Sequence, residues 1–80
     1  MSYAPLVEAL VKGVVDSPEK VTIEEEFDMG TRTFHVAVEK EDVGKIIGKS
    51  GRVINAIRFI VSAVASKSKE RAYVKVVTEA

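Results

Sequence analysis

Several residue types that carry chemistry are absent or scarce in this 80-residue sequence. It contains no cysteine and no tryptophan, and its single histidine is His35. The lack of cysteine excludes disulfides and thiolate-ligated metals and is consistent with a reducing, cytoplasmic compartment. One histidine excludes a multi-histidine metal site. Because the chain also lacks a Ser/His/Asp arrangement and is hardly long enough to enclose a substrate, we expect no enzymatic activity, catalytic residue, metal or cofactor.

Long hydrophobic runs are missing as well. No apolar stretch approaches the ~20 residues of a membrane-spanning helix, and the N-terminus lacks the basic segment and apolar core of a signal peptide. We therefore expect no membrane partner. Hydrophobic residues make up 46% of the sequence, an ordinary share for a folded chain. Residues 1–80 are accordingly expected to form one small domain.

An excess of charge of one sign is absent overall but present locally. The formal net charge is zero, with 12 basic and 12 acidic side chains. Residues 1–42 carry four basic and ten acidic side chains, whereas residues 43–80 carry eight basic and two acidic ones. This asymmetry indicates a polyanionic partner for the second half. The overall neutrality predicts modest affinity, because few phosphates can be neutralised.

The hydrophobic periodicity predicts six elements and places them in a definite order. They are a helix over 3–15, strands over 21–28 and 32–39, two helices on either side of residues 48–51, and a strand over 73–78. Ser2 is expected to cap the first helix. Glu24 and Glu26 are expected on a solvated face of their strand, where charge discourages sheet-to-sheet association.

Residues 46–54, Ile-Ile-Gly-Lys-Ser-Gly-Arg-Val-Ile, are the most informative stretch. Gly48 and Gly51 allow a sharp turn and a close approach of a ligand to the backbone. The N–H groups that open the second helix, with Lys49 and Arg52 beside them, suit a phosphate backbone. A nucleotide-binding P-loop is excluded, because its first glycine would fall at position 43, which is a valine.

This run resembles the signature of the KH domain family, Ile-Ile-Gly-x-x-Gly-x-x-Ile, at every fixed position. With the order helix-strand-strand-helix-helix-strand, the whole chain resembles the bacterial, type II arrangement of that family, and in particular its small single-KH RNA-binding proteins. The resemblance implies an α+β fold in which a three-stranded sheet carries three helices on one face and the last strand is parallel to its neighbour. It also implies that the Gly-x-x-Gly loop holds single-stranded RNA. The implied role is that of a post-transcriptional regulator or RNA chaperone tied to cell shape.

The resemblance further implies which residues line the RNA groove. The loop contacts the sugar–phosphate chain, the helix before it lines one wall, and the basic loop before the last strand forms the opposite rim. The residues expected to bind RNA are Gly44, Lys45, Ile47, Gly48, Lys49, Ser50, Gly51, Arg52, Lys67, Lys69 and Arg71. The five aromatic side chains are scattered and predict no stacking platform, so sequence preference is expected to be weak.

The long helix predicts a second surface. On a helical wheel its core-facing stripe is expected to comprise Val53, Ile57, Ile60 and Val64, bordered by Ile54 and Val61. Phe59 falls on the other side with the small residues Ala56 and Ala63 beside it. Because aromatic residues are favoured at protein contacts, these three predict an interface for a homodimer or for a heterodimer with a second KH-containing protein. A single exposed aromatic is also common on monomers.

A different function stays open at this stage. The chain could be a protein-interaction module in which the glycine loop binds RNA weakly or not at all. The basic residues at the tip of the loop, Lys49 and Arg52, argue against it, because a loop that served only the turn would not require them.

Overall fold

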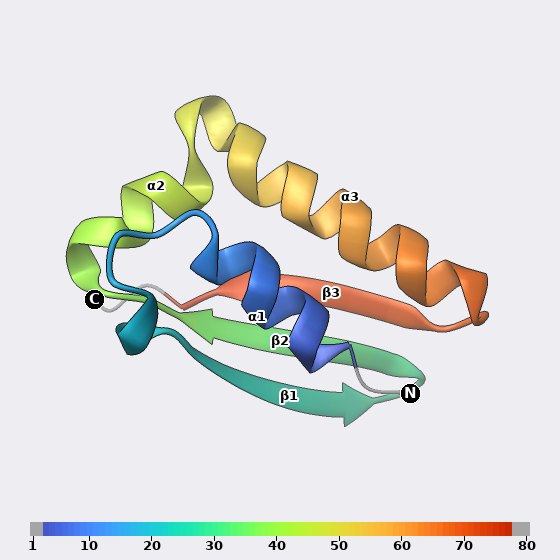
Figure 1. Ribbon diagram of the computed structural model, residues 1–80. Coiled ribbons are helices and arrows are strands. Elements are labelled where there is room, and N and C mark those ends of the chain that lie inside the picture. The colour runs from blue at the N-terminus through green and yellow to red at the C-terminus, as the bar shows by residue number, and fades with distance from the viewer. Residues whose placement is uncertain (1–2, 78–80) are drawn as a thin grey trace.

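The computed structural model describes residues 3–77 and has the predicted order of elements. The helices are α1 (Ala4–Lys12), α2 (Val43–Ile47) and α3 (Arg52–Lys67), and the strands are β1 (Thr22–Asp28), β2 (Thr31–Ala37) and β3 (Arg71–Val76). Short 3₁₀ turns lie at Pro18–Lys20, Lys40–Asp42 and Lys49–Gly51. Figure 1 shows the three helices on one face of the sheet. The α+β architecture predicted from the sequence is therefore confirmed.

The sheet has the order β1-β2-β3. β1 is antiparallel to β2, with Ile23 opposite Val36, and β3 is parallel to β2, with Phe34 opposite Val74. The parallel pairing of the last strand agrees with what the family resemblance implies, and the two helices that precede the strand provide the crossover that such a pairing needs. β3 begins at Arg71, two residues before the predicted start, so that Arg71 belongs to the strand.

The ends of α1 differ from the sequence prediction. Ser2 lies outside the described residues, and Tyr3 occupies the position before the first turn without a capping hydrogen bond from its side chain. The helix ends at Lys12, three residues earlier than predicted, and Gly13 follows it. The next residues remain close to the core, where Val15 is buried. Thr78, expected to close the last strand, also lies outside the described residues.

The core lies between the sheet and the helices and is made mainly of valine and isoleucine. Val7 and Val11 of α1 are fully buried, as are Phe34 and Val36 of β2 and Val74 of β3. On α3, the predicted core-facing stripe is wrong, because the stripe that is buried is rotated around the helix axis by part of a turn. The residues that α3 buries are Ile54, Ile57, Val61 and Ala65.

Ile60 and Val64, predicted to lie in the core, are 40% and 37% exposed. The apolar arc of α3 is wider than the surface that the sheet and α1 can cover, so the sequence alone did not specify its centre. The part of the arc that contacts the sheet is the part beside Arg58, whose side chain reaches the backbone of β3. The opposite margin, with Ile60 and Val64, is left open to solvent.

A buried carboxylate connects α2 to the chain that follows α1. Asp42 is 2% exposed and accepts a hydrogen bond from the backbone N–H of Ser17 at 3.0 Å. Lys45, one turn further along, lies 2.9 Å from Asp16 and 3.9 Å from Asp42. These contacts fix the position of the helix that carries the glycine loop.

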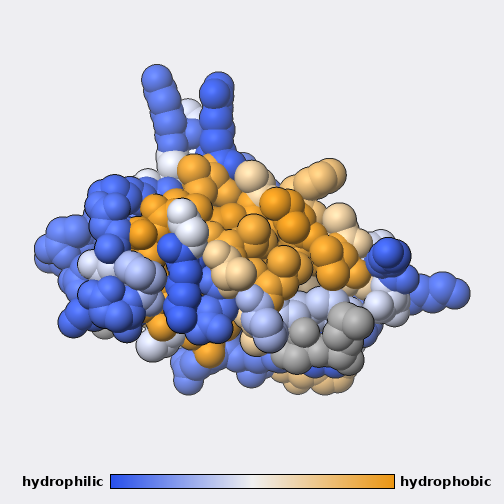
Figure 2. Space-filling model, viewed as in Figure 1, coloured by the Kyte–Doolittle hydropathy of each residue, from blue (hydrophilic) through white to orange (hydrophobic). Residues whose placement is uncertain are grey.

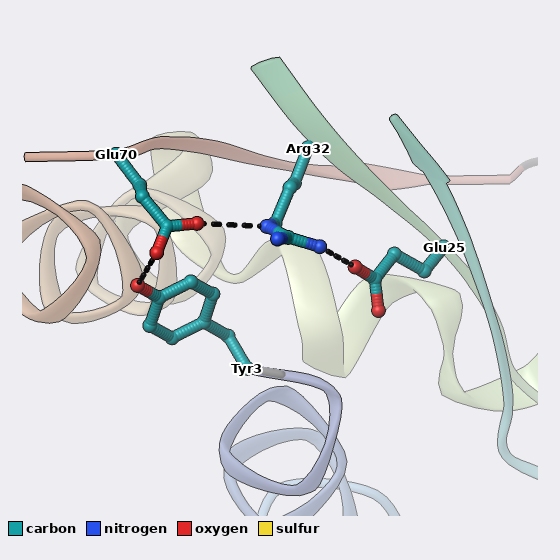
Figure 3. Close-up of polar contacts among 4 residues, drawn as sticks. All are labelled: Tyr3, Glu25, Arg32 and Glu70. Atoms are coloured by element: carbon teal, nitrogen blue, oxygen red, sulfur yellow. Dashed lines mark hydrogen bonds and ion pairs between the residues drawn. The ribbon is translucent and has the colours of Figure 1, made fainter. Parts of the chain in front are cut away.

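A second polar network joins Tyr3, which precedes α1, to β1, to β2 and to the residue just before β3 (Figure 3). Arg32 donates to Glu70 at 2.9 Å and to Glu25 at 2.7 Å, and the Tyr3 hydroxyl donates to Glu70 at 3.0 Å. The guanidinium of Arg32 also lies 5.0 Å from the centre of the Phe27 ring. Hydrogen bonds from Arg32 and then Tyr3 lower the pKa of Glu70, and the bonds to Glu70 and Glu25 raise the pKa of Arg32.

The turn between α2 and α3 depends on two glycines with positive φ. Gly48 has φ 75° and ψ 175°, a region that is essentially restricted to glycine. A Cβ at this position would lie 2.4 Å from Cγ2 of Val53 and 2.9 Å from its backbone nitrogen. Gly51 is in the left-handed region, but a Cβ there would meet only the side chain of Asn55 at 3.6 Å. Gly48 therefore allows the two helices to approach, and Gly51 allows the turn to begin α3.

No helix within residues 3–77 is long and apolar enough to cross a membrane.

The Glu70 network predicts a dependence of stability on pH. Because the folded-state pKa of Glu70 is lower than its ordinary value of about 4.3, its contribution is present above that pH and is lost as the pH falls below it. Wild type should melt at a higher temperature than Glu70→Gln at neutral pH, and the difference should shrink towards about pH 3. Glu24→Gln, which removes a carboxylate from the exposed face of β1, serves as the control. A Glu70→Gln difference that stayed constant with pH would contradict this account.

The glycine turn predicts unequal effects of two alanine substitutions. Gly48→Ala combines a strained backbone with a clash against Val53 and should lower the free energy of unfolding by about 3 kcal/mol. Gly51→Ala meets only the backbone term and should cost about 1 kcal/mol. Urea unfolding of both variants provides the comparison. Equal losses would show that the contact with Val53 does not constrain the turn.

Candidate nucleic-acid interface

The exposed tip of the α2–α3 turn carries two cations and a hydroxyl. Lys49 and Ser50 are exposed, and Arg52 is exposed at the first position of α3. Ser50 has φ 56°, so the backbone turns at the tip itself. Within residues 3–77, neither Lys49 nor Arg52 pairs with a carboxylate. The backbone N–H groups of Gly51 and Arg52 are used within the turn, where they donate to the oxygens of Gly48 and Lys49, so the expected set of free N–H groups is smaller than the sequence suggested. The uncompensated positive charge of the tip comes from the side chains of Lys49 and Arg52, at the positive end of the α3 dipole.

Lys45, also expected in the RNA groove, lies elsewhere. Its ammonium group pairs with Asp16 in the segment after α1, and that hydrogen bond raises the pKa of Lys45. Its charge is partly neutralised and is directed away from the loop tip. Gly44 is exposed, and a Cβ added to it would meet no heavy atom within 4 Å; Ile47 is partly buried beside it. The structure thus brings Gly44, Ile47 and the loop to one end of the molecule.

The side of α3 that faces β3 continues this surface and was not identified from the sequence. Arg58 donates from Nε to the backbone oxygen of Val74 at 2.8 Å and from Nη1 to Oδ1 of Asn55 at 3.4 Å. Its guanidinium lies 4.8 Å from the centre of the Tyr73 ring. Asn55 and Arg58 are three residues apart, which places both beside the core stripe on the same flank of the helix. That spacing was visible in the sequence, but which flank faced the strand was not.

The edge of β3 that does not pair with β2 lies beside this flank of α3 and is contacted by it. Arg58 and Ser62 of α3 bond to the backbone oxygens of Val74 and Ala72, Ser62 at 3.4 Å. Since β3 pairs on its other side with β2, these oxygens belong to its free edge. Polar contacts thus link the α3 flank to the free edge of β3, and Asn55 of the same flank lies beside Gly51 of the loop.

Lys67, Lys69 and Arg71 do not close a groove around the loop tip. Arg52 and Lys67 stand at opposite ends of α3, about 22 Å apart at 1.5 Å per residue. Figure 1 shows the turn into β3 at the end of the molecule away from the α2–α3 turn. The three basic residues therefore form a separate group, distant from the predicted phosphate contacts.

The charge asymmetry of the sequence becomes a spatial one. β1 forms one edge of the sheet and carries Glu24, Glu26 and Asp28 on exposed positions. β3 forms the other edge and carries Arg71 and Lys75. A polyanion is therefore favoured along the edge formed by β3 and α3 and disfavoured along β1.

Features typical of other kinds of site do not coincide with the loop. No group of three or more potential metal-ligating side chains occurs within residues 3–77. An open hollow of about 400 Å³ lies between α1 and β1, lined by Ala4, Pro5, Glu8, Val21, Thr22 and Ile23. It lies at the acidic edge of the sheet and contains none of the predicted RNA-binding residues.

Comparisons with known proteins agree with this architecture. The family model described as KhpA/KhpB, KH domain, matches residues 4–76. Proteins named RNA-binding protein KhpA are similar over most of their length. The one from Listeria monocytogenes is 40% identical over 72 residues, covering 90% of this chain and 95% of the relative. The one from Thermotoga maritima is 39% identical over 65 residues, covering 81% and 87%.

A solved structure shares the fold. The crystal structure of Aquifex aeolicus Era superposes with a TM-score of 0.67 over 95% of this chain and 31% of that protein, at 16% identity. At that identity the similarity concerns the fold alone. The match to the family model over nearly the whole chain and the curated relatives near 40% identity establish more than the fold: this chain belongs to the KhpA/KhpB KH-domain family.

Proposed function

We propose that this protein binds single-stranded RNA at the α2–α3 turn. The observation that carries the proposal is the exposed tip formed by Lys49 and Ser50, held between two positive-φ glycines and free of carboxylate partners within the described residues. A KH loop of this kind clamps the backbone of about four nucleotides. The relatives named RNA-binding protein support the same function.

The geometry suggests how the strand is held. Phosphates meet the side chains of Lys49, Ser50 and Arg52, where positive charge is uncompensated at the N-terminal end of α3. The bases then lie towards Ile47 and the α3 flank, where Asn55 and Arg58 offer polar groups. Because few cations contact the strand, the affinity should be modest. It should also depend weakly on salt, since the slope of log K against log salt concentration is about −0.7 for each phosphate neutralised.

The alternative, a protein-interaction module without RNA binding, is less well supported. The loop retains both the glycines that shape it and the cations that would contact phosphate. In the cell, we propose a post-transcriptional role such as RNA chaperoning.

Replacing Lys49 and Ser50 by aspartate tests the RNA site. The double variant places two negative charges where phosphates should lie and keeps both glycines, and aspartate tolerates the left-handed conformation of Ser50. Affinity for a single-stranded RNA tetranucleotide, measured by fluorescence anisotropy, should fall at least tenfold, with the melting temperature almost unchanged. A matched control, Lys20→Asp with Thr22→Asp, adds the same charges at two exposed positions away from the loop.

Two results would contradict the proposal. Unchanged affinity in the loop variant would place the RNA site elsewhere. Equal or tighter binding of a duplex of the same sequence would exclude a groove that requires unpaired bases.

We also propose that α3 pairs with a second KH domain, either another copy of this chain or a different protein. Phe59 is 74% exposed on the side of α3 opposite the core. Ala56 and Ala63 are exposed next to it, and the exposed Ile60 and Val64 extend the apolar surface further than the sequence predicted. Figure 2 shows apolar side chains gathered over α1 and α3 on one face. The small side chains of Ala56 and Ala63 leave room beside Phe59 for a second helix, and aromatic residues are enriched at protein contacts.

Sedimentation of wild type and Phe59→Glu at micromolar concentration tests self-association. Wild type should sediment as a dimer and Phe59→Glu as a monomer, because the carboxylate would be buried without a partner. Thr22→Glu adds the same charge on the sheet and should leave the dimer intact. A dimer that persists in Phe59→Glu would place the interface elsewhere, and a monomeric wild type would leave only a pairing with a different protein.

A further inference from the structure

Strand β3 carries a row of alternating basic and aromatic side chains on the outer face of the sheet. Ala72 and Val74 are buried under the helices, so Arg71, Tyr73 and Lys75 point to the opposite face. Consecutive members of the row are about 6.6 Å apart along the strand. Arg71 and Lys75 are therefore about 13 Å apart, a span that four nucleotides of a stacked strand cover at about 3.4 Å each.

Tyr73, in the middle of the row, is placed to stack on a base. It is 46% exposed, and its neighbour across the sheet is the small Thr33. The guanidinium of Arg58 lies over the ring at 4.8 Å and is itself held by the backbone oxygen of Val74. Aromatic rings and guanidinium planes are the two groups on which unpaired bases stack in RNA-binding proteins.

The row is connected to the glycine loop by a chain of contacts. Gly51 lies beside the Asn55 side chain, and Asn55 accepts a hydrogen bond from Arg58. Arg58 then reaches past the free edge of β3 to Tyr73. A strand that leaves the loop along this flank of α3 therefore arrives at the outer face of β3.

The charges on the rest of the sheet confine such a strand to β3. The exposed positions of β1 carry Glu24, Glu26 and Asp28, two strand spacings or about 10 Å away from β3. Between them, His35 of β2 is hydrogen-bonded to Glu26 at 2.9 Å. Phosphates are repelled from β1 and attracted by Lys75 and Arg71, so the path follows the strand.

We infer that single-stranded RNA longer than the four nucleotides of the loop continues over the edge of β3 onto the outer face of the sheet. There Tyr73 stacks on a base, and Lys75 and Arg71 contact phosphates. This inference rests on the proposed function, because the strand reaches the row from the loop. It assigns a role to a face of the sheet that the four-nucleotide groove does not use.

The test compares a tetranucleotide with a dodecanucleotide of unpaired RNA. Tyr73→Ser should lower affinity for the dodecanucleotide about tenfold, whereas Tyr73→Phe, which keeps the ring, should retain it. Lys75→Gln should reduce the salt slope for the dodecanucleotide by about 0.7. Affinity for the tetranucleotide should be unchanged in all three. Lys20→Gln, which removes one exposed cation before β1, is the matched control and should affect neither length.

The outcomes separate this inference from the proposed function. If Tyr73→Ser and Lys75→Gln bind both lengths like wild type, or lose affinity equally for both, the extended path is wrong while the loop site stands. If Lys49→Asp with Ser50→Asp keeps its affinity for the tetranucleotide, the proposed function itself is wrong. Lys75→Gln alters an exposed side chain, so its result holds even if Tyr73→Ser melts early.

Discussion

The contact between the backbone of Gly48 and Val53 sets the geometry on which the rest of the binding surface depends. α2 has only five residues and cannot hold its position by its own hydrogen bonds. Its place is determined by Ile46 in the core, by Asp42 bonded to the chain after α1, and by the close approach at Gly48. With the start of α3 fixed against α2, the loop tip must project outward, and the charges of Lys49 and Arg52 meet no carboxylate within the described residues.

The charges follow from the same arrangement. Carboxylates near the loop are occupied, since Asp16 pairs with Lys45 and Asp42 is bonded to the backbone of Ser17. At the opposite end of the molecule, Glu70 is occupied by Arg32 and Tyr3. With these acidic groups engaged elsewhere, the cations of the loop tip keep their charge. A protein with no net charge can therefore present a positive surface to a phosphate backbone.

Helix α3 serves three surfaces because it is long and lies on the outside of the helical layer. One flank packs its Ile57 and Val61 on the sheet, a second carries Arg58 to β3, and the third exposes Phe59 and Ile60. The proposed protein pairing is centred on Phe59 and leaves the Arg58 flank open. Asn55 and Arg52, which belong to the proposed RNA surface, lie four and seven residues before Phe59 on the same face, so the two surfaces adjoin at the start of α3.

The sequence by itself determined the order of elements and the glycine loop, because each depends on local periodicity or on residues adjacent in the chain. The parallel direction of the last strand came from the family resemblance, because strand pairing joins residues far apart in the chain. Only the tertiary structure decided which residues of α3 face the core. Its apolar arc spans more than the buried width, so Ile60 and Val64 could be excluded from the core only by knowing which flank meets β3. The partners of Lys45 and Arg58 are likewise 29 and 16 residues away in sequence. Contacts between residues so far apart depend on packing, which periodicity does not encode.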